Sequence, residues 1–392
     1  MHIRILLLAL AIIGASCSGN EDEYVQIENE DVIDQSVISD VFGQNIDVND
    51  LYNYENQIIP NYITQDNTAG NAISDEKATL GRVLFYDKNL SSNNTVACAS
   101  CHQQAFAFGD INDASIGVNG ETGRHSMRLV NARFAREDNF FWDERANTLE
   151  EQTTQPIQDH AEMGFSGANG DPSLADLLVK LGDLDYYQEL FTFAYGDNVI
   201  TETRLQESLA QFIRSIQSFD SKYDIGIGMV QNENQDFPNF TAQENLGKSL
   251  FMTPPNQNGA GCVACHTAPE FDIDPQSRNN GIFGVLGDPE ATDYTITRSP
   301  SIRDVFNSAG VLNGALMHDA SMSTFIQVVN HYNNIDPTGN PNLDNRLRGG
   351  PGGNGQNLNL SNEEILALEA FVKTLSGTNV YTDLKWSDPF LN

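Results

Sequence analysis

Two short motifs carry residues that can hold a metal cofactor. Residues 98–102 read Cys-Ala-Ser-Cys-His, and residues 262–266 read Cys-Val-Ala-Cys-His. A redox dithiol needs no histidine after its second cysteine and normally belongs to a βαβ unit, which this sequence lacks. A structural zinc site needs four ligands, whereas only the adjoining histidine stands near each cysteine pair. Cys-x-x-Cys-His is the signature of c-type haem attachment, so we predict two covalently bound haem c groups.

The cysteines and the histidine of each motif bind the haem in different ways. The two thiols form thioethers with the porphyrin vinyl groups, and the imidazole binds the iron from one face. The cysteines predicted to attach the haems are Cys98, Cys101, Cys262 and Cys265. The predicted iron ligands are His102 and His266. The group on the opposite face of each iron decides between electron transfer and peroxide chemistry.

The sequence around the two motifs also repeats. Residues 79–102 and 245–266 each contain Leu-Gly-x-x-Leu-Phe near their start and continue through an Asn-rich loop to the cysteines. A repeat of this length predicts two related domains. We place an N-terminal haem domain at residues 56–235 and a C-terminal haem domain at residues 236–385.

Helical patterns dominate the remainder of the chain. Apolar residues recur on one face of residues 203–219, and Ser361 with Glu364 forms a capping box before another apolar stripe. Strand-like alternation is scarce. The sequence therefore predicts a mainly α fold of two cytochrome c-like haem domains related by internal duplication.

The N-terminus resembles an export signal. Residues 1–16 contain one arginine, a short apolar run and then small residues, and the run is too short to span a bilayer. The sequence before Cys17 resembles a lipobox, although Gly14 stands where leucine is favoured, so Cys17 is either acylated or lost with the signal peptide. Residues 17–55 are expected to form an acidic flexible linker. We predict a periplasmic, extracytoplasmic protein that meets the membrane only through Cys17.

The strong negative charge limits the partners. The formal net charge is −33, so nucleic acid and anionic membrane surfaces would repel the protein. A redox partner would need a basic docking patch.

Residues 80–375 resemble the bacterial di-haem cytochrome c peroxidases and their MauG-like branch, the methylamine-utilisation di-haem oxidase. Besides the haem motifs, the shared features are Trp-Asp-x-Arg-Ala at 142–146, Leu-Glu-Glu-Gln at 149–152, Pro156 followed by Glu162-Met, and Met-His-Asp-x-Ser at 317–321. The resemblance implies reduction of hydrogen peroxide to water with electrons from a small protein, a cytochrome c or a cupredoxin. The alternatives are an oxidase that acts on a protein substrate and a di-haem electron carrier.

The resemblance also implies roles for individual residues. It places the peroxidatic haem at His102, with Gln152, Pro156 and Glu162 over it, and matches Trp142 to a tryptophan that relays electrons between the haems. A carboxylate above an open haem can move the proton that cleavage of the peroxide bond requires. Glu162 is therefore the expected acid–base group, and Gln152 is expected to hold peroxide by hydrogen bonds.

Three positions depart from the family pattern. Residues 110–124 contain no histidine, whereas many family peroxidases carry a blocking histidine there, so we expect the first haem to be open at rest. Glu144 stands where the family usually has glycine. The calcium ion that the resemblance implies would use the side-chain position of His125 and the carbonyls of Asn313 and Ala315. An imidazole is a poor ligand for so hard a cation, which disfavours calcium here.

The distal ligand of the second haem should come from residues 317–334. The candidates are Met317, Met322, His331 and Tyr332. Helical spacing places Tyr332 on an apolar face with Val328 and Val329, whereas His331 shares a face with Gln327. Tyr332 also falls where family peroxidases carry methionine and the oxidase carries tyrosine. We predict Tyr332 as this ligand, with a structural core tyrosine as the alternative.

Overall fold

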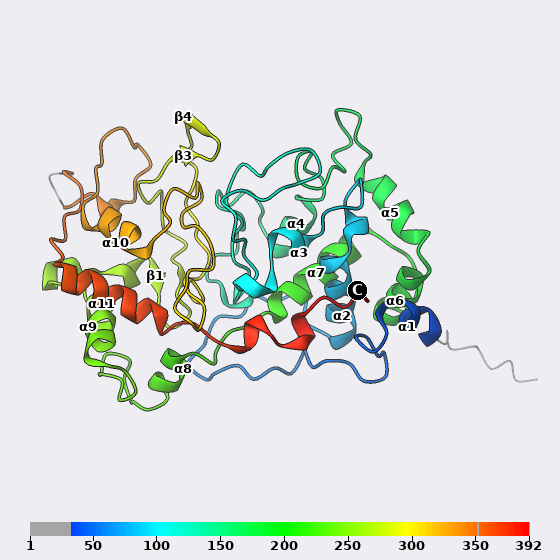
Figure 1. Cartoon of the computed structure of the whole chain (residues 1–392), viewed down its shortest axis with the longest axis horizontal. Helices are drawn as coiled ribbons and strands as arrows, with labels where there is room; N and C mark the ends of the chain where they lie inside the picture. The colour runs from blue at the N-terminus through cyan, green and yellow to red at the C-terminus, as the bar shows by residue number, and fades with distance from the viewer. Residues whose placement is uncertain (1–32, 351–352, 392) are drawn as a thin grey trace, which may run out of the picture. The chain divides into compact units, whose positions relative to one another are not determined.

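The computed structural model describes residues 33–350 and 353–391, and it consists of short helices joined by long loops (Figure 1). The predicted mainly α fold is confirmed, because the strands are few and short. None of the helices in the described ranges combines the length and apolar character that a membrane span requires. The predicted signal peptide and Cys17 lie outside the described residues.

The elements follow one another along the chain in this order. The helices are α1 (Gln35–Phe42), α2 (Asp75–Tyr86), α3 (Cys98–Cys101), α4 (Leu149–Thr154), α5 (Leu174–Gly182), α6 (Asp185–Tyr195), α7 (Glu202–Ser215), α8 (Lys222–Ile227), α9 (Ala242–Met252), α10 (Phe325–Asn333) and α11 (Asn362–Lys373). The strands form two small antiparallel pairs, β1 (His266–Thr267) with β2 (Asp272–Ile273) and β3 (Gly284–Val285) with β4 (Asp288–Thr292).

The two helices expected from the sequence are both present. The hydroxyl of Ser361 and the carboxylate of Glu364 form the predicted capping box at the start of α11. The helix expected at 203–219 is α7, which ends earlier, at Ser215. Residues 216–218 leave the helix because their backbone pairs with Asn131, whose amide N–H donates to the carbonyl of Ile216 (3.0 Å) and whose side chain bonds Ser218 in both directions.

Two pairs of helices form the centres of the two main hydrophobic cores. In the first core α2 crosses α7, and a Cβ added at Gly81 would lie 2.0 Å from the carbonyl oxygen of Ser208. In the second core α9 crosses α11, and a Cβ added at Gly247 would lie 1.9 Å from the carbonyl oxygen of Ala367. The glycine of each Leu-Gly-x-x-Leu-Phe motif is therefore the point where two helix backbones touch.

The expectation of a flexible linker over residues 17–55 is wrong for the part that the structure describes. Helix α1 buries Ile38 and Phe42 completely, and the ring of Phe42 packs against Tyr186 and Phe390, with centroid distances of 5.7 and 5.0 Å. Apolar residues four positions apart give one helix face that can join the core, even in an acidic segment. The acidic average composition of residues 17–55 gave no sign of this apolar helix face.

The end of the chain returns to the first core, which the expected domain boundaries did not include. The buried guanidinium of Arg82 in α2 donates from Nε to the carbonyl of Ser387 (2.7 Å), and the hydroxyl of Tyr86 donates to the carbonyl of Trp386 (2.6 Å). The indole N–H of Trp386 donates to the hydroxyl of Ser215 at the end of α7 (3.2 Å). Residues after α11 therefore complete the packing of α2 and α7.

We predict that Gly81→Ala lowers the free energy of unfolding by about 1–3 kcal/mol, the usual cost of forcing an extra carbon into a packed contact. Urea denaturation followed by circular dichroism measures the change. Gly182→Ala, at the end of α5, is the matched control because a Cβ there meets nothing within 4 Å. Equal stability of the two variants would contradict this account of the helix crossing.

Candidate haem and peroxide site

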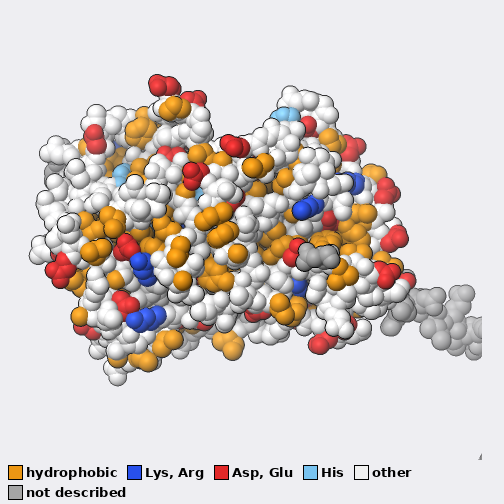
Figure 2. Space-filling model, in the orientation of Figure 1, with side chains coloured by type: hydrophobic (Ala, Val, Ile, Leu, Met, Phe, Trp, Pro, Cys, Tyr) orange, Lys and Arg blue, Asp and Glu red, His pale blue; other side chains and the backbone are white. Residues whose placement is uncertain are grey.

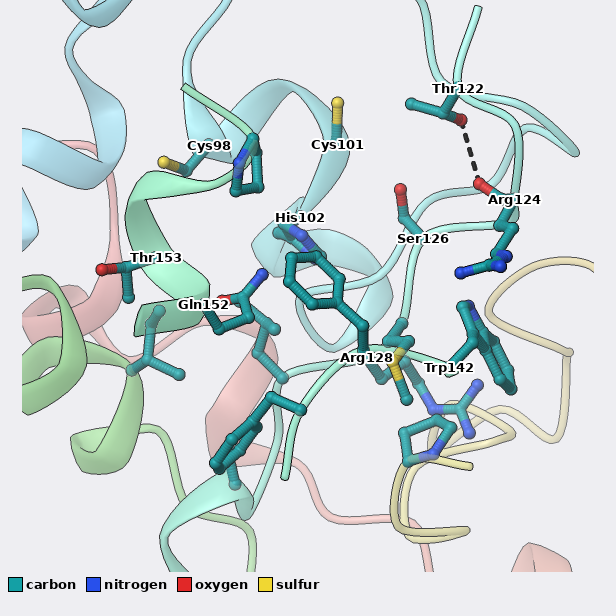
Figure 3. A pocket seen from close by; sticks show the side chains of 18 of the residues that line it. Cys98, Cys101, His102, Thr122, Arg124, Ser126, Arg128, Trp142, Gln152 and Thr153 are labelled. Carbon is teal, nitrogen blue, oxygen red and sulfur yellow. Dashed lines mark hydrogen bonds between the residues drawn. The ribbon is translucent and has the colours of Figure 1, made fainter. Parts of the chain in front are cut away.

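One large cavity brings together residues that the sequence analysis selected from separate segments (Figure 3). Its volume is about 480 Å³, within the range of small-molecule and cofactor sites. The predicted site residues in its wall are Cys98, Cys101, His102, Trp142, Gln152, Pro156 and Glu162. In Figure 3 the cysteines and His102 come from α3 and its end, and Gln152 points into the cavity from α4.

The first haem motif folds as a single helical turn that fixes its histidine. The amide N–H of His102 donates to the carbonyl of Cys98 (2.9 Å), which closes the turn. The Nδ1 atom of His102 lies 3.1 Å from the carbonyl oxygen of Phe108. Because a carbonyl can only accept, Nδ1 carries the proton and Nε2 keeps the free lone pair that an iron ligand needs. Burial also lowers the pKa of His102, which favours the neutral imidazole.

The ionisation of the thiols argues against a redox dithiol, and the lack of neighbouring ligands argues against zinc. Burial raises the pKa of Cys98 to about 12 and that of Cys101 to about 11, and Cys262 and Cys265 follow the same pattern. All four thiols are free. Redox dithiols depend on lowered thiol pKa values, and a structural zinc site needs two further ligands beside each thiol pair. Across residues 33–350 and 353–391, moreover, no three His, Cys, Asp or Glu side chains converge as a metal site.

A buried arginine offers a further test of whether the cavity suits haem. The Nε–H of Arg128 is buried and has no hydrogen-bond partner among the described residues, while its Nη2 donates to the carbonyl of Ser301 (3.3 Å). Arg128 lines the cavity. A guanidinium with an unused donor in a cavity wall suits an anionic group, and haem carries two propionate carboxylates. The donors and the charge in this cavity therefore fit haem.

Glu162 has the electrostatic setting of an acid–base group. Burial raises the pKa of Glu162 to about 7; the negative charge of Asp159 contributes, and the positive charge of Arg145 opposes it. A carboxyl that titrates near neutral pH can both accept and return a proton under ordinary conditions. Gln152 lines the same cavity and adds an amide that can donate and accept hydrogen bonds.

The loop that lacks a histidine holds the backbone of Glu162 in place. The amide of Val118 donates to the carbonyl of Glu162 (2.9 Å), and the amide of Asn119 donates to the carbonyl of Ala161 (3.1 Å). A Cβ added at Gly117 would lie 2.1 Å from the carbonyl oxygen of Ala161. Only glycine allows this approach, so the loop supports the segment that carries Glu162.

Trp142 is fixed between residues from both halves of the sequence. Its indole N–H donates to the carbonyl of His125 (2.8 Å), and its own carbonyl accepts from the amides of Thr297 and Arg298 (3.0 and 3.1 Å). Its ring centroid lies 6.1 Å from that of His318, whose carbonyl accepts from the amide of His125 (2.8 Å). This network leaves the indole little freedom to move.

The residues at the implied calcium position do not fit calcium. The imidazole of His125 is buried, and its Nδ1 lies 3.1 Å from the carbonyl oxygen of Asp113. A Cβ added at Gly314 would lie 3.4 Å from Cε1 of the same ring, so the ring occupies the space beside residues 313–315. Calcium prefers six to eight oxygen ligands, and a buried imidazole supplies none.

The turn after Trp142 keeps a conformation that favours glycine. Glu144 has a φ of 58°, in the left-handed region. Its carboxylate accepts a hydrogen bond from the hydroxyl of Thr297, which compensates for the strained backbone. The unusual glutamate therefore preserves the turn.

The second haem motif presents a buried histidine. Cys262–Ala264 form a short 3₁₀ turn, and His266 begins β1. Burial, helped by the charge of Arg346, lowers the pKa of His266 to about 4, so the imidazole is neutral. Its Nδ1 is buried without a hydrogen-bond partner among the described residues.

Asn280 organises the candidate ligands opposite this motif. Its side-chain amide donates to the hydroxyl of Tyr332 (3.1 Å) and to the sulfur of Met317 (3.4 Å). Its carbonyl lies 2.9 Å from Nε2 of His331, which must therefore donate its proton there. Burial raises the pKa of Tyr332, and the hydrogen bond from Asn280 opposes this rise. Cys265 and Cys262 also act on this pKa, so the phenol lies near the second motif.

Several residues of the site escaped the sequence analysis. They are Gly117, Arg128, Asp159 and Asn280. Arg145 was visible only as part of the Trp-Asp-x-Arg motif. Glycines in the loop around Gly117 could have indicated a close backbone contact there. No local sequence pattern indicates that Asn280 bonds Tyr332.

Comparisons with known proteins identify the family of this chain. Residues 75–231 match the family described as di-haem cytochrome c peroxidase. Over 314 residues the chain is 30% identical to the methylamine utilization protein MauG of Methylophilus methylotrophus, covering 78% of this chain and 84% of that protein. The chain belongs to the di-haem cytochrome c peroxidase family. The predicted family is thus confirmed, and with it an oxidoreductase that uses haem.

Two further relatives represent both branches of this di-haem family. The cytochrome c551 peroxidase of Nitrosomonas europaea is 27% identical over 310 residues, which are 77% of this chain and 80% of that protein. The solved structure of a MauG-like protein associated with microbial copper homeostasis superposes with a TM-score of 0.67 at 27% identity. That match covers 85% of this chain and 99% of the other.

We predict that Gly117→Ala lowers kcat/KM for peroxide by roughly tenfold or more, because an ångström-scale displacement of a catalytic group can cost up to about 100-fold. The haem absorption spectrum should stay unchanged, since the haem motif is untouched. Ile116→Ala is the control, because this neighbouring side chain is 73% exposed. Unchanged turnover in Gly117→Ala would show that the loop does not position Glu162.

Proposed function

We propose that the chain reduces hydrogen peroxide to water with two electrons and two protons, the electrons coming from a small redox protein, a cytochrome c or a cupredoxin. The observation that carries this proposal is that Glu162 and Gln152 line the same cavity as the first haem motif. Bound haem would supply the iron at which peroxide is reduced. The comparisons support the same chemistry, since relatives of similar length are peroxidases.

The proposal assigns a covalent haem to each motif. The attaching residues are Cys98 and Cys101 for the first haem, and Cys262 and Cys265 for the second. His102 and His266 are the iron ligands. Neutral imidazoles and buried, protonated thiols at both motifs support this assignment. Calcium has no role in the proposed site.

Glu162 moves the proton. In its carboxylate form it accepts a proton from the near oxygen of bound peroxide and returns it to the departing oxygen, which leaves as water. A pKa of about 7 makes both halves of this transfer accessible near neutral pH. Gln152 orients the peroxide by hydrogen bonds. Trp142, held by bonds to both halves of the chain, relays electrons between the haems.

We further propose that the two haem-bearing parts, residues 56–235 and 236–385, arose by internal duplication. The support is that the same motif glycine makes the same close backbone contact in each core, Gly81 with Ser208 and Gly247 with Ala367. Each contact precedes a haem motif by a similar distance along the chain.

A MauG-like oxidase acting on a protein substrate is the second candidate function. Tyr332 lies near the second haem motif, and its hydrogen bond from Asn280 partly offsets the rise in its pKa that burial causes. Bound to iron, its phenolate oxygen would stabilise oxidised iron. A second haem with this ligand would accept electrons poorly, but it could share an oxidising equivalent with the first haem. A simple di-haem electron carrier ranks last, because an acid–base carboxyl beside an open iron would serve it no purpose.

The location and the partner follow from the leader sequence and the charge. We propose a periplasmic protein, anchored by a lipid on Cys17. On the face shown in Figure 2, acidic side chains are spread widely and basic ones are few, in keeping with the net charge of −33. A donor protein with a basic docking patch would be attracted to such a surface.

We predict that Glu162→Gln lowers peroxidase turnover by roughly 100-fold or more, the scale of an acid–base contribution. In the wild type, kcat/KM for peroxide should rise with pH up to about 7 and then level off, because only the carboxylate accepts the proton. The variant should lose this dependence. Mass spectrometry should find two haem additions in both proteins. Near-wild-type turnover would remove Glu162 from the mechanism.

We predict that Tyr332→Met raises the reduction potential of the second haem and adds the near-infrared sulfur-to-iron band, because methionine ligation raises haem potentials. Potentiometry with near-infrared spectroscopy measures both. Tyr294→Phe is the control, since that ring packs on Phe283, with a centroid distance of 5.0 Å, and Tyr294 is not among the candidate ligands. If Tyr332→Phe leaves the potential and the spectrum unchanged, the ligand is another residue.

A further inference from the structure

A second, smaller cavity shares a wall with the haem cavity. Its volume is about 280 Å³, and we call it the vestibule. The residues that line it are Arg145, Gln155, Pro156, Gln158, Asp159 and Glu162. Four of them, Arg145, Pro156, Asp159 and Glu162, also line the haem cavity. The two spaces are therefore separated by little more than these side chains.

The vestibule leads from solvent toward the haem cavity. Arg145, Gln158 and Asp159 are exposed, whereas Pro156 and Glu162 are partly buried. Except for Pro156, every lining side chain carries hydrogen-bonding groups. Amides, a guanidinium and carboxyls together offer donors and acceptors to a small polar molecule at any orientation. A large or apolar molecule would gain nothing from this lining.

The shared wall is held in a defined position. The guanidinium of Arg145 lies 3.5 Å from the ring centroid of Phe141, and its Nη1 donates to a carboxylate oxygen of Asp143 (2.9 Å). The other oxygen of Asp143 accepts from Nη1 of Arg124 (2.7 Å). Stacking and a doubly paired carboxylate thus fix Arg145 at the boundary, although nearly half of its side chain is exposed.

Glu162 stands at the boundary with its carboxyl free. Asp159 accepts hydrogen bonds from the amides of Ala161 and Glu162 (2.8 and 3.0 Å), which fixes the turn that carries Glu162. In the described part of the chain, no donor lies within hydrogen-bonding distance of the Glu162 carboxyl. Because Glu162 lines both cavities, its carboxyl can form a hydrogen bond with a molecule that enters from the vestibule.

We propose that the vestibule is the entrance through which hydrogen peroxide, a small uncharged molecule rich in hydrogen-bonding groups, reaches the haem cavity. Glu162, which lines both cavities, is the first acid–base group that the peroxide meets. The identity of the substrate rests on the proposed peroxidase function, whereas the route itself holds for any small uncharged ligand of the first haem. Water uses the same path, so Glu162 exchanges protons with solvent through the vestibule.

The test narrows the vestibule without touching the haem. Gln158→Trp places a bulky ring on an exposed position of its lining, and Gln155→Phe is a second, independent obstruction. Gln243→Trp is the matched control, an exposed glutamine in α9 outside both cavities. Stopped-flow absorption measures the association rate of peroxide and of cyanide with the oxidised holoprotein, and titration measures cyanide affinity.

The route predicts a specific combination of results. Both association rate constants should fall by roughly tenfold or more in the obstructed variants, within the one to three decades that association rates span among variants. Cyanide affinity should stay the same, because a blocked path slows entry and exit equally. Wild-type rates in both folded obstructed variants would overturn the entrance. If the wild type binds cyanide at an obstructable rate but does not consume peroxide, the route stands and the proposed function fails.

Discussion

The architecture depends on two places where helix backbones touch without a side chain between them. At Gly81 and at Gly247 a single added carbon would lie 2.0 Å or less from a carbonyl oxygen of the crossing helix. Each crossing sets the direction in which the chain leaves its helix, and each haem motif follows within about one loop. Cys98 packs against the first core and Cys262 against the second, so each haem motif rests on the same core as its motif glycine.

Desolvation is the common cause of the chemistry in the first cavity. Burial raises the pKa of Cys98 and of Glu162 and lowers that of His102. Cys98 and His102 are consequently uncharged near neutral pH, the state suited to thioether formation and to metal binding, whereas Glu162 gains and loses its proton at about pH 7, as proton transfer requires. The same enclosure leaves Arg128 as an incompletely paired cation that suits an anionic cofactor. One apolar setting thus prepares several different groups at once.

The features that could be predicted are those that depend on residues close together in the sequence. The capping box at Ser361 is a local pattern, and the structure confirms it. The haem motifs are equally local, and the match to the di-haem family confirms the use of haem. The packing of Phe42 against Phe390 joins residues nearly 350 positions apart, and no local pattern encodes it. Likewise Gly117 looks like any loop glycine until Ala161 is placed beside it. The roles of Asn280 and Asp159 depend on equally distant neighbours.

The return of the chain end to the first core has a consequence for biogenesis. Trp386 is almost fully buried beside α7, and the carbonyl of Ser387 accepts from the buried Arg82. During synthesis α2 and α7 can pack together early, but this core is complete only after residues 386 and 387 have been made. Removal of Trp386 and Ser387 would therefore leave the first hydrophobic core incompletely packed.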